Sequence, residues 1–538
     1  MTDLNRSARL MAVLTVVSRL SGFARVMVFT WVFGKSYLAN TYVSSNTVPN
    51  ILFELFAAGA LQAVLVPTMV RLMPSAAAGR EGLQHPTEAE RVAGTVVGLL
   101  CGVLAFVGVV AVAFGPQVMR LLVDDVPSAR IRQDEVELGA LFLWFFMPQL
   151  VFYGANVVAT AVLNARNRFA LPVFAPTLNN VVVIGAYLWF DAVHTGPLTL
   201  DLTSAETWIV AGGTTLAVVV FCALPVLAVW REGFSLRPRF EVRQPAIVAL
   251  LREGAWAGVF LALTQVVQVV ILKVANREAG APTVYQFAFI LFTLPHALFS
   301  VPVMTTRFPQ MSRAAQAGDW VDYRRTVAIA VRSIAFLALA ASAVSIAVAG
   351  PGAELLAYGK GASLAPRIAA ATMAFAPGIV GFGLLLFFTR ALYATTDART
   401  PALVNLGLVV VTSVVMLTAV PLLSNRDLVT GLAGAFAVGN LGGALALGWI
   451  VDRRLEARSA GTMHVAAPVT RSLVAAVVAA GLGWLAGDAV GWATKPAAVL
   501  AVAAGASVAI VVFVGIQWAL GGPGPQLALR TLGAGDVP

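Results

Sequence analysis

Long apolar stretches recur along nearly the whole chain, and they limit its fold more than any other feature. A helix of about 20 apolar residues crosses the hydrocarbon core of a bilayer. At these lengths only helices bond every backbone N–H and C=O group inside lipid. The candidate spans are 8–33, 38–72, 92–122, 137–164, 169–191, 205–230, 246–276, 280–306, 325–349, 367–393, 400–423, 428–451, 468–487 and 496–520. We therefore predict an all-α polytopic membrane protein with about fourteen transmembrane helices.

The composition excludes other classes of protein. The chain is 59% hydrophobic and 12% charged, whereas about a quarter of the residues of a soluble domain are charged. The net charge of +10 would suggest nucleic acid in a soluble protein, but here it is typical of cytoplasmic loops, and we expect no nucleic-acid partner. Arg19 and Arg25 interrupt the first apolar run, so we expect it to be retained and not cleaved as a signal peptide.

The distribution of basic residues predicts the orientation. If the N-terminus is cytoplasmic and the spans alternate, most loop Lys and Arg residues lie on the cytoplasmic side, as they do in membrane proteins generally. The loop 123–137 then lies outside, and it is acidic. We therefore expect a multi-pass protein of a bacterial plasma membrane with both termini in the cytoplasm.

Three pairs of similar short segments, which we call echoes, indicate an internal repeat. They pair Pro67-Thr68-Met69 with Pro309-Gln310-Met311, Gly115-Pro116 with Gly350-Pro351, and Leu163 and Ala165 with Leu392 and Ala394. Each echo is shifted by six spans, and an even shift preserves the membrane orientation, which makes the repeat parallel. The predicted organisation is a six-helix lobe at 1–240, a second at 241–458, and two additional helices with a short cytoplasmic tail at 459–538. A kink or break is expected near Pro49 in the long second span.

The sequence has no catalytic constellation. It lacks a nucleophile elbow, a phosphate-binding Walker loop and metal-ligand spacing. Cys101 and Cys222 lie inside apolar runs, where they are interpreted as packing residues. We expect no enzymatic activity, no cofactor and no metal. A membrane transferase that relies on loop carboxylates stays the most distant alternative.

Ionisable groups at membrane depth are costly and mark functional sites. The first span carries Ser18, Arg19 and Arg25, and Arg19 lies near its middle. We expect Arg19 to face a polar cavity, although pairing with a backbone carbonyl or with Glu54 is an alternative. A cationic cavity suits an anionic cargo, because Arg grips phosphate with two hydrogen bonds and keeps its charge when desolvated.

Polar residues on two other spans complete the candidate site. Asn46, Asn50 and Glu54 follow one another at four-residue spacing, so they form one stripe of the second span. The seventh span carries Gln265, Gln268 and Lys273. Hydrogen bonding between helices explains the stripe without any function, and Lys273 could instead reach the outer interface.

Several motifs resemble the MurJ (MviN) lipid II flippase family. They are SRLSGFAR at 18–25, VPN at 48–50, Gly59-Ala60, Val66-Pro67, LNARNRF at 163–169, Asn179-Asn180, Tyr358-Gly359, LYA at 392–394 and Thr400-Pro401. The resemblance covers roughly residues 8–455 and is most specific in the first 180. The chain looks like a divergent member from a high-GC Gram-positive bacterium.

The resemblance implies the fold and the function. The fold would be that of the MOP exporter superfamily, with a groove for a polyprenyl tail beside the last two helices. The cargo would be lipid II or a related polyprenyl-pyrophosphate lipid, moved from the inner to the outer leaflet by alternating access, and Arg19 and Arg25 would bind its pyrophosphate. Proteins of cell-wall synthesis or division are candidate partners.

The chain departs from the family pattern at charged positions. Val26 and Asn40 stand where many members have acidic residues, and Ile290 stands where many have arginine. Either Lys273 compensates, or the headgroup is recognised differently, or the chain is a divergent paralogue. Two alternatives therefore stay open: an exporter of another lipid-linked saccharide or a drug, and a non-transporting cell-wall scaffold.

Overall fold

The structure is a computed structural model. It describes residues 2–58, 65, 68–69, 72, 88–166, 168–241, 245–459 and 461–521, without the side chains of 2–12, 57–58, 245–255 and 257. These residues form helices and loops and contain no strand, which confirms the predicted all-α class. Most of the end of the second span, including Gly59-Ala60 and Val66-Pro67, and the C-terminal tail lie outside the described residues.

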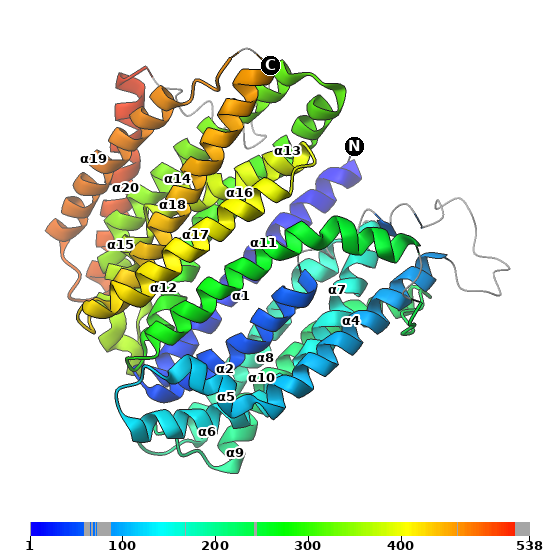
Figure 1. Ribbon diagram of the computed structural model, residues 1–538. Helices are drawn as coiled ribbons and strands as arrows, with labels where there is room; N and C mark the ends of the chain where they lie inside the picture. Colours follow the sequence, from blue (N-terminus) through cyan, green and yellow to red (C-terminus); the bar gives the residue numbers. More distant parts are fainter. Residues whose placement is uncertain are drawn as a thin grey trace. The chain divides into compact units, whose positions relative to one another are not determined.

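The helices fall into two compact units, Met1–Gly280 and Ala281–Pro538 (Figure 1). The first unit contains α1 (Thr2–Phe33), α2 (Tyr37–Phe53), η1 (Glu54–Ala58), α4 (Glu88–Ala113), α5 (Gly115–Val123), α6 (Ala129–Phe146), α7 (Gln149–Ala165), α8 (Ala170–Val193), α9 (Ser204–Thr207), η2 (Trp208–Gly212), α10 (Gly213–Arg231) and α11 (Pro245–Ala275). The helix α11 packs against η1, α2, α4 and α5, and therefore groups with the first unit. The lobe division at 240 follows from the repeat, and it stays a prediction.

The second unit contains the remaining helices. They are α12 (Ala281–Pro295), η3 (His296–Ser300), α13 (Val301–Ala317), α14 (Trp320–Leu356), η4 (Gly359–Leu364), α15 (Ala365–Phe375), α16 (Gly378–Ala394), α17 (Arg399–Thr418), η5 (Val420–Leu422), α18 (Leu428–Ser459), α19 (Ala466–Val490) and α20 (Lys495–Ala519).

Twelve helices of the described part are long and apolar enough to cross a membrane, and the bent pair α15–α16 would make thirteen. The predicted number was about fourteen. The difference lies in the second span, since α2 has only 17 residues before η1 begins and the chain beyond 58 is mostly undescribed. The α-helix continues through Pro49 to Phe53, and the change to a wider π-helical turn comes at Glu54.

Irregular turns recur at equivalent places in the two units. The π-turn at Glu54 is separated from the one at His296 by the same number of residues that separates Pro67 from Pro309. Helices α6 and α7 are divided at Met147-Pro148, and α15 and α16 at Ala376-Pro377. Continuous spans are predicted over 137–164 and 367–393, but each is divided at a proline, which lacks an N–H and disfavours helical backbone in the preceding residue. These correspondences support the predicted parallel repeat.

Ion pairs tie the loop after α7 and the loop after α16 to other helices of their own units. The Arg166 guanidinium lies 2.8 Å from a Glu232 carboxylate oxygen, and that of Arg454 lies 2.6 Å from Asp397. Partial burial raises the pKa of Asp397, but hydrogen bonds from Thr400 and Arg454 outweigh it and hold this pKa below its ordinary value. The carboxylate is therefore charged at neutral pH, and the pair persists there.

The additional helices α19 and α20 pack on each other and on α14 (Figure 1). Close approach depends on small residues: a Cβ on Gly483 would come within 2.8 Å of the Cβ atoms of Ala347 and Ala509. At one end Lys495 pairs with Glu354 at 3.4 Å and lies over the Tyr358 ring. In lipid, small residues of this kind let helices pack closely. Helices α19 and α20 are therefore packed firmly on α14 as part of the second unit.

Candidate functional site

The predicted cations of α1 lie in different environments. Arg19 is exposed, whereas Ser18 and Arg25 are half-buried. Helix α1 packs along α8, and Ser21, one turn after Ser18, accepts a hydrogen bond from Asn180 at 2.9 Å. The six-residue spacing separates the two arginines in depth and direction, as the sequence predicts.

Arg25 lies one turn before Phe29, whose ring centroid is 5.3 Å from that of Tyr42 and 5.4 Å from that of Tyr187. Arg25 is close enough to the hydroxyl groups of Tyr42, Tyr153 and Tyr187 to act on them electrostatically. Tyr187 donates to Tyr42 at 2.8 Å, and the Tyr42 hydroxyl lies 2.8 Å from that of Thr214. We call Tyr42, Tyr153, Tyr187 and Thr214 the tyrosine cluster. It fixes polar groups next to a cation inside an otherwise apolar bundle.

Among the side chains that the structure describes, no carboxylate neutralises Arg19 or Arg25. Within the described part of the chain, no ion pair joins Arg19 or Arg25 to an acidic residue, and none joins either to Glu54. An unpaired guanidinium at membrane depth is costly. It can hold an anion through its five N–H donors, so Arg25 and the tyrosine cluster form the best candidate binding site in the first unit.

The stripe on α2 has one internal hydrogen bond. The side chain of Asn50 donates to the Asn46 carbonyl at 3.0 Å and is exposed, while Asn46 is half-buried. Glu54 is half-buried at the first position of η1, and η1 packs against α11. The stripe is therefore accessible. Its last residue, Glu54, lies in the turn that packs against α11, the helix that carries Gln265 and Gln268.

Another face of α2 holds the end of α11 in place. Ser44 and Asn276 are hydrogen-bonded, and Asn276 also donates to the Leu122 carbonyl at 3.0 Å. Asn40 donates to the Glu278 carbonyl at 2.9 Å and accepts from the Gly280 N–H at 2.8 Å. Gly280 has a φ of +77°, which favours glycine. Asn40 stands where many members of the family that the chain resembles have an acidic residue. In this structure it is buried and holds the backbone after α11 in place.

Lys273 is held at the end of α11 by acidic residues. Its Nζ lies 3.6 Å from Asp124 and 3.9 Å from Asp125. Gln265 contacts Thr264 at 3.4 Å, and Gln268 is half-buried on the same helix. The structure therefore places Lys273 with the acidic residues that follow α5, which fits the interfacial interpretation of this residue.

We expect Lys273→Met to change function little. Pairs that are partly exposed contribute about 0–1 kcal/mol, and Asp124 keeps a second partner in Arg132 at 3.7 Å. Growth of cells depleted of the native protein should be restored to within about twofold of wild type, a change well below 1 kcal/mol. Failure of Lys273→Met to restore growth, with a normally folded variant, would show that Lys273 acts in transport.

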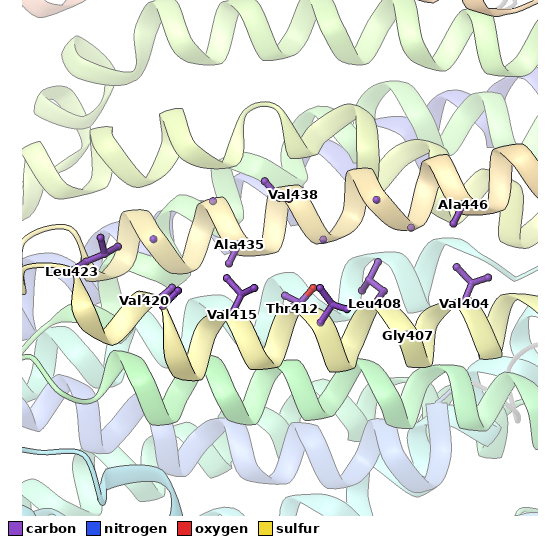
Figure 2. Close-up of a pocket in the computed structure, with 17 residues that line it drawn as sticks. Val404, Gly407, Leu408, Thr412, Val415, Val420, Leu423, Ala435, Val438 and Ala446 are labelled. Carbon is purple, nitrogen blue, oxygen red and sulfur yellow. The ribbon is translucent and has the colours of Figure 1, made fainter.

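Two apolar grooves lie in the second unit. The first, of about 770 Å³, runs between α17 and α18 and is lined by Val404, Leu408, Val415, Val438 and Ala446, among others (Figure 2). Only Thr412 contributes a polar side chain to it. A groove of this composition suits a hydrocarbon chain but cannot bind a charged headgroup.

The second groove, of about 670 Å³, borders the additional helices. Val331, Phe388 and Trp449 line it from α14, α16 and α18, and Ala466 and Leu473 line it from α19. Asp452 lies at this groove and accepts a hydrogen bond from the Met463 N–H at 2.7 Å. This is the place where the family resemblance implies a groove for a polyprenyl tail.

The sequence alone missed the tyrosine cluster. Its members come from α2, α7, α8 and α10, and no spacing in the sequence relates them. The motifs of the sequence analysis include its neighbours on α1 and α8, namely Arg25 in SRLSGFAR and Asn180, which donates to Ser21, but none of the four cluster residues. In the described residues, no group of three or more His, Cys, Asp or Glu side chains could hold a metal ion.

Comparison with known proteins places the chain in a family context. The family model described as "Lipid II flippase MurJ" matches residues 29–517. The chain is 27% identical over 421 residues to the lipid II flippase MurJ of Burkholderia cenocepacia, covering 77% of this chain and 78% of that protein. It is 25% identical to a probable lipid II flippase MurJ of Rhizobium tropici, covering 79% and 76%.

Solved structures share the fold. A lipid II flippase MurJ in an inward closed conformation has a TM-score of 0.70 and 16% identity, covering 95% of this chain and 99% of that one. An inward-facing MATE family multidrug resistance transporter of the MOP superfamily has a TM-score of 0.61 and 14% identity, covering 83% and 99%. The expected superfamily fold is therefore confirmed.

Proposed function

The chain belongs to the lipid II flippase MurJ family, and on that premise we propose that it moves lipid II from the inner to the outer leaflet of a bacterial plasma membrane. The observation that carries the proposal is the family match over residues 29–517. An unpaired Arg25 beside the tyrosine cluster supports it, since a pyrophosphate needs a cation at membrane depth. The chain is a transporter in this proposal, with both termini in the cytoplasm.

The pyrophosphate of the cargo binds Arg25 and Arg19 in this mechanism. Arg25 is half-buried and lies near hydroxyl donors, so it forms the inner contact, while the exposed Arg19 meets the headgroup first. Ser18, Asn46 and Asn50 supply neutral hydrogen-bonding groups to the sugars and the peptide. Gln265 and Gln268 do the same from α11, and Glu54, half-buried at the start of η1 against that helix, accepts hydrogen bonds from headgroup N–H and O–H groups.

The polyprenyl tail lies in the groove between α19 and the helices α14, α16 and α18. The lining is apolar along most of its length, so the isoprene units leave the surrounding lipid at little cost. Headgroup and tail are bound separately, and rocking of the two lobes exposes the headgroup site to each side in turn. An inside-negative potential favours outward movement of negative charge by about 2.3 kcal/mol per charge per 100 mV.

Depletion of the protein in its native cell tests the proposal. Lipid II exposed on the outer face should fall at least about tenfold, a difference of about 1.4 kcal/mol in the apparent distribution, and lipid II should accumulate inside. Re-expression should restore the exposure. Normal exposure after depletion would reject the proposal and leave the other two predicted roles, an exporter of a different cargo or a cell-wall scaffold.

A further inference from the structure

A polar pocket between α13 and α14 lies apart from the proposed transport site. Its volume is about 480 Å³, and Arg307, Gln310 and Arg313 line it from α13, with Asp322, Arg325 and Thr326 from α14. Gln310 belongs to the repeated Pro-x-Met motif of the sequence analysis, and Arg313 follows that motif by two residues. Nothing in the proposed mechanism uses these residues.

The charge of the pocket is not balanced. Three guanidinium groups face one carboxylate, so the net charge is three minus one, or +2. Across the described residues, none of the three arginines has an ion-pair partner. Arg307 donates one hydrogen bond to Gln310 at 3.1 Å, Arg313 donates one to the Pro309 carbonyl at 3.3 Å, and no bond to Arg325 is found in the same region. Most of their N–H donors therefore remain available.

Three other arginines of this unit are engaged. Arg454 pairs with Asp397, Arg324 donates to Ser459, and Arg458 lies over the Trp320 ring at 4.3 Å. The three pocket arginines thus differ from Arg454, Arg324 and Arg458, which are ion-paired, hydrogen-bonded to another helix or stacked on a ring. An arrangement that keeps cations unpaired in a concave site is typical of anion binding.

The pocket lies where an apolar span meets the polar region. It borders the α13–α14 turn at Gly318, and the loop charge pattern predicts that this end is cytoplasmic. Phe308 and Val321, which precede or follow pocket residues, are 36% and 59% exposed. Exposed apolar side chains beside a cationic pocket suit a ligand with a phosphate head and acyl or prenyl chains.

We propose that this pocket binds the phosphate groups of an anionic lipid in the inner leaflet. The Arg307, Arg313 and Arg325 guanidiniums hold the phosphate oxygens, and Gln310 and Thr326 add neutral hydrogen bonds. Two sources share this chemistry: a resident lipid with two phosphodiester groups, such as cardiolipin, and a polyprenyl pyrophosphate waiting to enter the transport site. Binding at the pocket does not require the proposed function, because it needs no movement across the membrane.

Native mass spectrometry of the purified full chain in neutral detergent tests the proposal. One arm adds cardiolipin, and phosphatidylethanolamine reports unspecific attachment. A second arm adds undecaprenyl pyrophosphate to variants that also carry Arg25→Ala, so that the proposed transport site does not mask a loss at the pocket. The triple variant Arg307→Gln, Arg313→Gln, Arg325→Gln should bind at least one of the two anionic lipids about a hundredfold more weakly, and Arg325→Gln alone about fivefold more weakly. The arm that shows the loss identifies the source.

A matched control keeps the test decisive. The triple variant Arg130→Gln, Arg277→Gln, Arg426→Gln removes the same charge from positions outside the pocket and should bind as wild type does. Unchanged thermal unfolding of all variants excludes misfolding, and Arg325→Gln is the mildest change because it breaks no hydrogen bond found here. If the pocket variants bind both lipids as tightly as the control, the pocket is not a lipid site, whatever the outcome of the depletion experiment.

Discussion

Arg25→Ala should abolish the ability of the protein to sustain growth and to expose lipid II on the outer face. A hydrogen bond to a charged group contributes about 1.5–3 kcal/mol, which corresponds to a roughly 10- to 150-fold weaker interaction with the pyrophosphate. The affinity for the pyrophosphate should fall further while the cargo crosses the membrane. Among the described residues, no other half-buried cation lies beside the tyrosine cluster to replace Arg25. Complementation of depleted cells and outer lipid II labelling measure it.

Two variants separate charge from geometry at this position. Arg25→Lys keeps the cation but lacks the planar fork, so it should restore exposure only in part. Arg120→Ala removes an exposed arginine from α5 and should behave as wild type. Full activity of Arg25→Ala in a protein that expresses normally would contradict the proposed pyrophosphate site and would favour the scaffold role.

Phe292→Ala should cause the largest loss of stability in the second unit. The Phe292 ring is 2% exposed, and its centroid lies 5.1 Å from that of Phe375, 5.5 Å from Phe382 and 5.9 Å from Phe436. Removing a buried Phe costs about 3–5 kcal/mol through lost contacts and the remaining cavity. In a unit of this size, that loss corresponds to a fall in melting temperature of roughly 10 °C. Tryptophan fluorescence of the protein in detergent measures the melting temperature.

Phe106→Ala is the matched control for this variant. Phe106 is 70% exposed on α4, so its removal leaves no cavity and should lower the melting temperature by no more than about 2 °C, the shift expected from a change below 1 kcal/mol. Equal shifts for the two variants would mean that the aromatic cluster does not contribute to the stability of the second unit. Phe292→Leu should fall between them, because it retains part of the volume.

Most of the helices follow from the sequence, because the requirement they satisfy is local. Each apolar stretch must bond its own backbone groups in lipid, and the prolines at 148 and 377 interrupt helices through the atoms of their own residues. The one uncertain span illustrates the limit of this argument. Pro49 predicts a kink, but the α-helix continues past it and the change to a π-turn comes at Glu54, where packing against α11 adds to the local preference.

The candidate site divides in the same way. The sequence by itself determined that Arg19 and Arg25 are cations at membrane depth, because their spacing within one apolar run fixes their positions along the helix. Only the tertiary structure decided that Lys273 pairs with Asp124 and Asp125, and that Arg25 lies beside Tyr42, Tyr153 and Tyr187. These partners come from helices far apart in the chain, and the rotation and packing of those helices depend on all of their side chains together.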